Sequence, residues 1–439
     1  MARPLLPRHV VPMRDLSSPR STDGRRERPE NRAWLLLLLT ALAACSGSHL
    51  GANEAADGGG DGSTPDSGPD GSGRLHVVRG QNGQLGHLVD GSGHNIQLRG
   101  VDRFGTETDC NTFNKAGGGP QGPFDQSDID TIKAWKVNAV RVPLNEGCWL
   151  GTQNQPNYRK AVEDWVDLIT ANQLIAIVDL HWSTPSTQSS QSAMSNSTGQ
   201  QAMADAYNSI DFWKGIATTF AKNANVIFDL YNEPNVNDWT CWLVGGNNCG
   251  GANFDVAGMA QMLKAVRSAG ASNVVIMGGV SYAGDISKWQ ETVEKIPTLP
   301  APNDGLTLDD IAASVHVYDF NSLWSGCPSQ FNNYATTCYS AQTTADNQGI
   351  SPVIAAGYPV IVGETGISVF SGDPTPYSST QAQELATWFD NMLTWFDQNE
   401  QSYVAWSWNN DGSPHLLDDY SGTPSPTFGV TYQGHLAKF

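Results

Sequence analysis

The chain has few basic residues and no long apolar run. These two shortages limit its possible partners and argue against a membrane-spanning segment. Lys and Arg number 25 against 44 Asp and Glu in 439 residues, which gives a formal net charge of −19. Phosphate binding needs a basic surface, so we expect no nucleic-acid partner. The apolar run 33–44 is too short to span a bilayer.

Two motifs of enzyme and metal chemistry are also missing. No Gly-x-Ser-x-Gly occurs, which argues against a serine hydrolase built on a nucleophile elbow. None of the seven cysteines forms a Cys-x-x-Cys pair, so we predict no zinc site, no other metal and no cofactor. The acidic, Gly-rich composition suits a neutral polar ligand or an exported protein.

The amino-terminal segment has the composition of an export signal. Several arginines precede the run 33–44, which ends Leu42-Ala43-Ala44-Cys45. Small residues before a cysteine resemble a bacterial lipobox, in which the cysteine becomes the lipidated first residue of the mature protein. An ordinary signal peptide with an incidental Cys45 is the alternative. We predict a signal peptide over 1–44 and a lipoprotein at the cell surface or outer membrane, or otherwise an extracellular protein.

The next segment, 45–73, follows the predicted lipidated cysteine and consists mostly of Gly, Asp, Ser and Pro. This composition buries too little apolar surface to offset the entropy of ordering, so we predict a flexible linker. The remaining residues, 74–439, form the predicted main domain, which we expect to be monomeric.

Six cysteines remain if Cys45 carries lipid, and an even number in an exported protein indicates disulfides. The sequence leaves the connectivity open. The shortest spacings favour these pairs: Cys241 with Cys249, Cys327 with Cys338, and by remainder Cys110 with Cys148.

After residue 74, short apolar runs alternate with helical patterns. Segments 75–78 and 87–89 predict a β-hairpin cap. Eight apolar runs follow, at 96–101, 137–143, 174–181, 226–233, 273–279, 311–318, 359–364 and 403–408, with helical patterns that include 158–171, 206–222, 256–269 and 379–397. Apolar strands alternating with helices indicate a parallel sheet covered by helices, and eight such units close into a (β/α)8 TIM barrel of the α/β class.

Polar and aromatic side chains collect at the carboxyl ends of these predicted strands, the rim where such barrels carry their chemistry. For any single one, a satisfied structural residue is the common alternative. The nine are Arg141, His181, Asn232, Glu233, His316, Tyr318, Glu364, Trp406 and Trp408.

Two carboxylates stand out in this group. Glu233, within Asn232-Glu233-Pro234, follows the fourth strand and Glu364 follows the seventh, so they should face each other across the barrel mouth. On its own, Asn-Glu-Pro reads equally well as a strand end with a solvated glutamate. Enzymes that hydrolyse glycosides use a pair of carboxyl groups beside an aromatic side chain.

These motifs, together with Asp179-Leu-His181, His316-Val-Tyr318 and Ile361-Val-Gly-Glu364, resemble glycoside hydrolase family 5, the cellulase-like retaining (β/α)8 enzymes. The resemblance extends from about residue 74 to the carboxyl terminus. It implies that Glu233 is the general acid/base and Glu364 the nucleophile. It also implies substrate-binding or supporting roles for Arg141, His181, Asn232, His316, Tyr318 and Trp406, with Trp408 a weaker candidate for the stacking floor.

The chemistry implied by the resemblance sets expectations for the structure. Glu233 must be protonated while Glu364 is ionised, so we expect the charge of Glu364 to raise the pKa of Glu233 and Arg141 to keep that of Glu364 low. A retaining enzyme places the carboxyl groups about 5 to 5.5 Å apart. Further sugar contacts are expected from Trp149, Trp239 and Trp242. The loop 183–201 either sets specificity or is merely solvated.

The predicted function is therefore an endo-acting β-glycosidase on a polysaccharide, most simply a β-1,4-glucanase. A β-mannanase or another β-glucan hydrolase would use the same residues. A non-catalytic glycan-binding lipoprotein is the alternative from another class, although it would need neither carboxylate.

Overall fold

The computed structural model describes residues 73–108, 110, 121–151, 157–185, 197, 199–319, 340–367, 379–412 and 414–439. These residues belong to one compact unit. The predicted signal peptide, Cys45, Cys327 and Cys338 lie outside the described ranges. Within those ranges, the helices are too short or too polar to cross a membrane.

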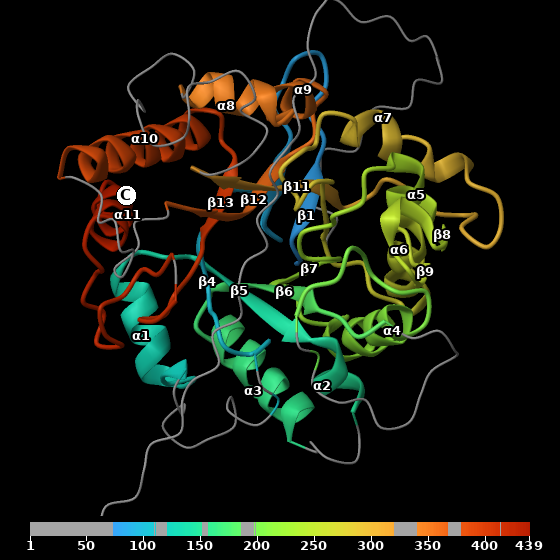
Figure 1. Cartoon of the computed structure of the whole chain (residues 1–439), viewed down its shortest axis with the longest axis horizontal. Helices are drawn as coiled ribbons and strands as arrows, with labels where there is room; N and C mark the ends of the chain where they lie inside the picture. The colour runs from blue at the N-terminus through green and yellow to red at the C-terminus, as the bar shows by residue number, and fades with distance from the viewer. Residues whose placement is uncertain are drawn as a thin grey trace, which may run out of the picture. The chain divides into compact units, whose positions relative to one another are not determined.

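Eight parallel strands close into a barrel, which confirms the predicted fold class (Figure 1). Around the barrel the order is β10-β11-β12-β13-β4-β5-β6-β7, so strands follow one another in sequence order. Their bounds are β4 Arg99–Asp102, β5 Ala139–Asn145, β6 Ile175–Trp182, β7 Val226–Asp229, β10 Val275–Gly278, β11 Ile311–Tyr318, β12 Val360–Gly366 and β13 Ser402–Ala405.

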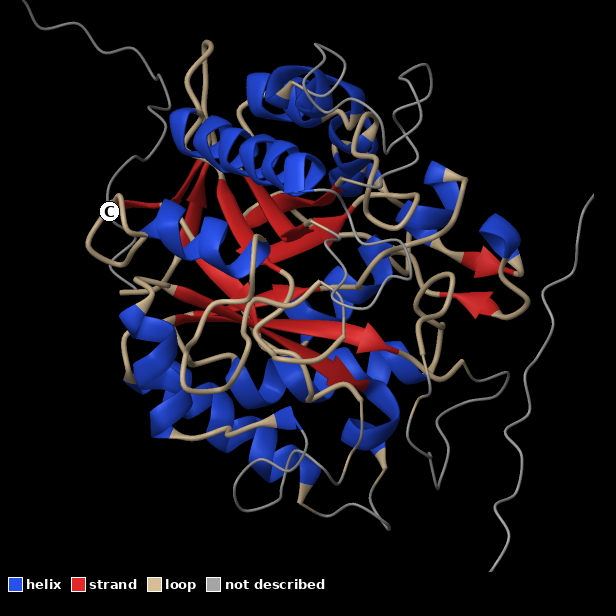
Figure 2. Ribbon diagram, turned by 60° about the vertical axis from the view of Figure 1, so that its left-hand side comes forward, coloured by secondary structure: helices blue, strands red, loops and turns tan. Residues whose placement is uncertain are grey.

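Helices surround these strands (Figure 2). Four follow the predicted helical patterns closely: α3 Tyr158–Ala171, α4 Asn208–Phe220, α6 Met259–Ser268 and α10 Ser379–Gln398. The others are α1 Gln126–Ala134, α2 Glu146–Leu150, α5 Trp239–Val244, α7 Trp289–Val293, α8 Ala341–Asn347, α9 Ile350–Ala355 and α11 Phe428–Leu436. Their apolar faces pack on the outward side chains of the strands and form the larger core.

A second, smaller core fills the barrel interior. The inward side chains of successive strands include Ile177, Ile227 and Ile276. Leu75 and Leu88 join this cluster from the amino-terminal cap, so the cap closes the barrel at the end where its strands begin. The cap is a three-stranded antiparallel sheet of β1 His76–Val78, β2 His87–Val89 and β3 Asn95–Ile96, one strand more than the predicted hairpin.

Two disulfides are present in the described part of the chain. Cys110 pairs with Cys148 and Cys241 with Cys249, as the spacing favoured. The first joins the segment after β4 to α2, and the second ties α5 to the short turn that follows it.

The fourth barrel strand differs from its prediction. β7 ends at Asp229 instead of continuing to Glu233. Hydrogen bonding to β6 continues beyond the end of β7, since the Asn232 N–H donates to the Leu180 carbonyl at 3.0 Å. Glu233 itself has a φ of 50°, a left-handed conformation that no strand accommodates.

Candidate active site

A layer of charged side chains lies directly above the apolar interior of the barrel. Because alternate residues of a strand face the same side, Arg141 points inward like Ala139, and Asp179 like Ile177. The same alternation places Asp229 two residues after Ile227. Strand periodicity therefore stacks a charged layer on the apolar one.

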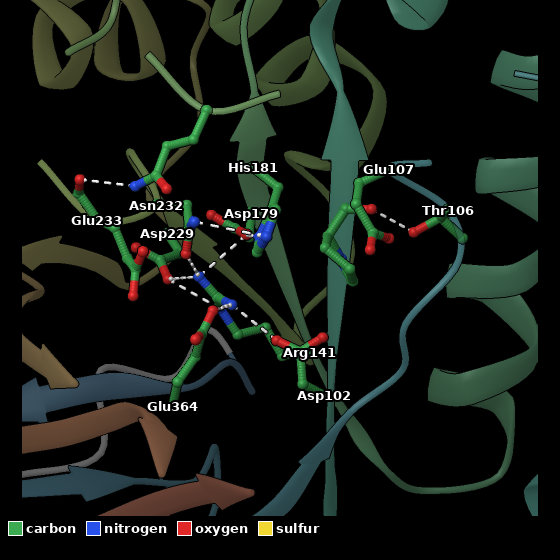
Figure 3. A network of polar contacts seen from close by, with 12 residues as sticks. Asp102, Thr106, Glu107, Arg141, Asp179, His181, Asp229, Asn232, Glu233 and Glu364 are labelled. Atoms are coloured by element: carbon green, nitrogen blue, oxygen red, sulfur yellow. Dashed lines mark hydrogen bonds and ion pairs between the residues drawn. The ribbon is translucent and has the colours of Figure 1, made fainter. Parts of the chain in front are cut away.

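Arg141 is the centre of this layer (Figure 3). Its guanidinium lies 2.7 Å from Asp102, 2.8 Å from Glu364, and 3.0 Å from both Asp179 and Asp229. All five side chains are nearly or fully buried. The sequence placed Arg141 near a strand end, but it is the third residue of β5 and reaches the rim only through its length.

One positive charge cannot balance four buried carboxylates. Burial is the largest cause that raises the pKa of Asp179 and of Asp229 to about 7, and the pKa of Asp102 lies well above its ordinary value for the same reason. Each of these three aspartates also has one buried oxygen without a hydrogen-bond partner among the described residues. The layer therefore retains protons at acidic pH.

Glu364 is fixed at both carboxyl oxygens. Arg141 donates to Oε1 at 2.8 Å, and the Tyr318 hydroxyl donates to Oε2 at 2.7 Å. Burial is the main cause that raises the pKa of Tyr318 well above its ordinary value, so the phenol remains a donor. These two donors fix the orientation of the carboxyl group.

A β-bulge brings His316 beside Glu364. Val315 pairs with Val362, but the next residue, His316, pairs with Glu364, so Gly363 is the extra residue. A Cβ atom at Gly363 would lie 2.7 Å from the Ser314 hydroxyl and 3.1 Å from His316 Nε2. Glycine therefore leaves the space that the imidazole occupies.

Glu233 lies against the same imidazole nitrogen as Glu364. His316 Nδ1 lies 3.1 Å from Glu233 Oε1 and 3.5 Å from Glu364 Oε2. One carboxyl oxygen of Glu233 and one of Glu364 lie within 4.8 Å of each other, a short separation of the kind that retaining enzymes use. The left-handed backbone of Glu233 is held by Gln200, whose amide donates to the Glu233 carbonyl at 2.9 Å.

The pKa of Glu233 is raised, as the sequence predicted, but by a different main cause. The largest contribution is burial of the carboxyl group, and Arg141 acts in the opposite direction. The Glu233 side chain keeps 22 % exposure, while that of Glu364 keeps 5 %. The rim thus pairs a partly open carboxyl with an enclosed one.

His181, Asn232 and Trp406 line the same side of the site. Asp179 accepts from His181 Nδ1 at 2.7 Å, and Asn232 Oδ1 accepts from Arg141 at 3.0 Å. Burial lowers the pKa of His181 to about 4, so its ring is neutral. Trp406 is half-buried and stacks on His181 with ring centroids 5.2 Å apart and an interplanar angle of 7°.

Three predicted tryptophan contacts are corrected. Trp408 is fully buried, and its indole N–H donates to Asp128 at 2.8 Å, because β13 ends at Ala405 and strand alternation no longer applies beyond it. Trp242 is also fully buried and donates to the Gly278 carbonyl. Trp149 is buried against Phe212. These rings belong to the core and offer no face to a sugar.

Trp239 is half-buried against Trp242, so it keeps some exposed surface after β7. The expected specificity loop is described only in part, since 186–196 and 198 lie outside the described ranges. Within it, Ser183 and Ser197 are buried.

Two groups of residues at the rim were missed by the sequence analysis. Asp229 was read only as a member of its strand and Asp102 lay just beyond the first predicted strand, although an acidic residue at an inward position was a usable signal. Tyr282, just after β10, is 53 % exposed, and its backbone N–H donates to the Pro234 carbonyl beside Glu233. Ser281, Tyr282 and Ala283 have φ angles of 55°, 60° and 54°, a left-handed run that sequence patterns do not reveal.

A further buried acid, Glu107, makes stability depend on pH. Its Oε2 accepts from the Gly105 N–H at 2.8 Å, while Oε1 has no partner among the described residues. Burial is the largest cause that raises the Glu107 pKa to about 8. Figure 3 shows Glu107 beside Thr106, apart from the Arg141 contacts.

We predict that Glu107→Gln flattens the loss of stability as pH rises. The folded pKa of Glu107 exceeds the unfolded value of about 4.3, so the unfolded chain releases this proton first. The contribution of protonated Glu107 to the free energy of unfolding is therefore complete below about pH 4. It is lost as pH rises towards about 8, and the loss is on the order of a few kcal/mol. Urea unfolding at several pH values between these limits measures the difference, and parallel curves for variant and wild type would contradict it.

A closed barrel with two neighbouring carboxyl groups, one after its fourth strand, β7, and one near the end of its seventh, β12, is the arrangement of a (β/α)8 glycoside hydrolase. The chain belongs to the cellulase family, glycosyl hydrolase family 5, whose family model matches residues 89–412. Membership confirms the predicted family.

Individual relatives are distant. Endoglucanase A of Butyrivibrio fibrisolvens is 23 % identical over 333 residues, which cover 74 % of this chain and 58 % of the relative. Cellulase CelDZ1 of a Thermoanaerobacterium species is 24 % identical over 332 residues, covering 74 % of this chain and 68 % of the relative. The chain thus spans little more than half of the first relative and about two thirds of the second.

Solved structures share the fold. An endocellulase from the archaeon Pyrococcus horikoshii superposes with a TM-score of 0.59 at 17 % identity, over 83 % of this chain and 99 % of that one. A β-glucanase from Saccharophagus degradans gives a TM-score of 0.56 at 18 % identity, over 86 % and 98 % of the two chains.

Proposed function

We propose that this chain is an endo-β-1,4-glucanase that cleaves its substrate with retention of configuration through Glu233 and Glu364. The observation that carries the proposal is the pair of carboxyl groups within 4.8 Å of each other, one fully hydrogen-bonded and one partly open. The endoglucanase and cellulase names of its relatives support the choice of substrate.

Two displacements follow from this geometry. In the first, the Glu364 carboxylate attacks the anomeric carbon while Glu233 gives its proton to the leaving oxygen, which forms a glycosyl-enzyme. In the second, Glu233 takes a proton from water, the water oxygen attacks the same carbon, and Glu364 is released. The raised pKa of Glu233 keeps its proton available for the first step.

The surrounding residues position the sugar and the nucleophile. Asn232 faces the site between Arg141 and His181, where an amide can bind the sugar 2-hydroxyl in the transition state. Trp406, braced by His181, provides the stacking floor. Arg141 and Tyr318 hold Glu364 in place for attack.

A reducing-sugar assay against a panel of polysaccharides tests the substrate class. Carboxymethyl-cellulose, mixed-linkage β-glucan, β-mannan and xylan would be compared at equal mass. We expect the highest rate on the β-1,4-glucan, with a rapid fall in viscosity that marks internal cleavage. A preference for mannan would replace the glucanase assignment by the mannanase one, and inactivity on all four would contradict the proposal.

We predict that Glu233→Gln separates substrates by their leaving groups. The amide cannot donate an acidic proton, so hydrolysis of cellulose oligomers should fall by about 10² to 10⁴-fold. An aryl cellobioside with a strongly acidic phenol needs no protonation, so its first step should survive and release a burst of phenol. Pre-steady-state absorbance measures this burst, and equal losses on both substrates would count against the acid role.

We predict that Tyr282→Ala weakens binding of long substrates more than it slows catalysis. Tyr282 is exposed and its backbone N–H donates to the carbonyl of Pro234, the residue after Glu233, so its ring is available to stack on a sugar of the leaving group. Removing it should raise KM for cellohexaose several-fold and leave kcat on a short aryl cellobioside unchanged. Tyr282→Phe is the matched control, and a kcat loss on the short substrate would argue against a stacking role.

We also propose that the chain is exported and anchored through lipid on Cys45. The support is the apolar run that ends at this cysteine and the presence of two disulfides, which are typical of oxidising compartments. Membrane fractionation of cells that express the wild type and Cys45→Ser tests the anchor. A variant that stayed in the membrane fraction would rule it out.

A further inference from the structure

The carboxyl pair and the imidazole between them have the spacing of metal ligands. Around His316 Nδ1, an oxygen of Glu233 lies at 3.1 Å and an oxygen of Glu364 at 3.5 Å. All three atoms lie within 4.8 Å of one another. Ligand atoms about 2.1 Å from a tetrahedral zinc ion stand about 3.4 Å apart, so small side-chain movements suffice to coordinate one.

Two of the three ligands are already fixed. Glu364 is held by Arg141 and Tyr318, and His316 is 2 % exposed in the space that Gly363 leaves. The third ligand, Glu233, keeps 22 % exposure of its side chain, which leaves an entry path and an open coordination position. A preorganised ligand set reduces the entropy lost on binding.

The charge of the surroundings independently favours a cation. Arg141 already contacts four carboxyl groups, and Glu233 adds a fifth acid to the site. Three buried aspartate oxygens have no hydrogen-bond partner among the described residues. An added divalent charge relieves this excess, whereas it would be repelled from a balanced network.

We propose that Glu233, His316 and Glu364 bind a divalent transition-metal ion such as Zn²⁺, and that the bound ion reversibly blocks the active site. One imidazole nitrogen and two carboxylate oxygens suit zinc, while Mg²⁺ and Ca²⁺ prefer oxygen ligands alone. The imidazole nitrogen and both carboxyl groups coordinate only when deprotonated, so binding releases any proton that they hold to solvent. The blocking effect rests on the proposed function, but the binding does not.

The ion acts here as an inhibitor, because it occupies the lone pairs that both displacements need. Coordinated Glu233 has no proton to give, and coordinated Glu364 cannot attack. The sequence predicted no metal site, since its ligands come from β11, β12 and the segment after β7 and have no local spacing that would identify them.

Calorimetric titration of the chelator-treated full chain with ZnCl₂ tests the binding without any sugar. We expect one ion per chain, and a loss of affinity of at least about tenfold in each of Glu233→Gln, His316→Gln and Glu364→Gln. Co²⁺ in place of Zn²⁺ should give the visible absorption of a tetrahedral site in the wild type alone. Thermal unfolding verifies that each variant is folded.

His94→Gln is the matched control, because His94 lies near Asp90 on the surface with 80 % side-chain exposure. This variant should bind Zn²⁺ as the wild type does. Unchanged affinity in all three site variants, or loss of binding in His94→Gln, would overturn the proposal. Chelator should restore β-glucan hydrolysis that Zn²⁺ has stopped; zinc binding in a chain inactive on all glycans would contradict only the proposed function.

Discussion

Glu364→Ala is expected to abolish hydrolysis of β-1,4-glucan, with a fall in kcat/KM of about 10⁴-fold or more, because the glycosyl-enzyme can no longer form. The variant should still fold, since Arg141 keeps three aspartate partners after the glutamate is removed. Initial rates on an aryl cellobioside measure the loss. Activity within tenfold of the wild type would exclude Glu364 as the nucleophile.

Azide provides the control for this variant. The space vacated by the Glu364 side chain can admit a small anion, which attacks the anomeric carbon from the same face and gives an α-glycosyl azide. Azide should restore turnover of an aryl glycoside whose leaving group needs no acid. Failure of rescue together with a normal unfolding transition would leave a structural role for Glu364 and contradict the catalytic one.

The second large effect is expected from Arg141→Met, which removes the only positive charge among the buried side chains that contact Asp102, Asp179 and Asp229 in the described part of the chain. Leaving buried carboxylates without their partner costs about 3–5 kcal/mol of stability. Because these acids regain protons at low pH, the loss should be larger at pH 8 than at pH 5. Denaturant unfolding at the two pH values measures it.

Lys160→Ala is the control, because it removes a positive charge that contributes little to the stability of the fold. Lys160 pairs with Asp164 on an exposed face of α3, with 68 % and 61 % of the two side chains exposed. Such a pair contributes less than about 1 kcal/mol. An Arg141→Met variant as stable as Lys160→Ala at both pH values would contradict the charge balance described for the barrel interior.

The barrel was predictable because its signals are repetitive. A short apolar run indicates each strand, and a longer amphipathic pattern indicates each helix. Errors of a few residues in a predicted boundary, as at the end of β7, therefore do not change the topology. The same regularity placed Glu233 and Glu364 at the rim together with His181, His316 and Tyr318. Motif and topology agree there, because function requires polar residues where strands end.

The features of the site that the sequence did not predict depend on three-dimensional geometry, which no local sequence pattern encodes. The place of His316 beside Glu364 depends on a bulge at Gly363, and the burial of Trp408 depends on β13 ending at Ala405. The four carboxyl groups around Arg141 come from four strands that are distant in sequence. For the same reason, the raised pKa of Glu233 could be predicted in direction, but its main cause required knowledge of burial.

The stereochemistry of the first product tests the central claim most directly. Proton NMR, recorded in the first minutes of cellotetraose hydrolysis by a large amount of enzyme, distinguishes the α- and β-anomers of the new reducing end before they interconvert. Double displacement through Glu364 and Glu233 predicts that the β-anomer appears first and that the α-anomer grows only by mutarotation. Initial formation of the α-anomer would contradict the retaining mechanism and the roles assigned to both glutamates.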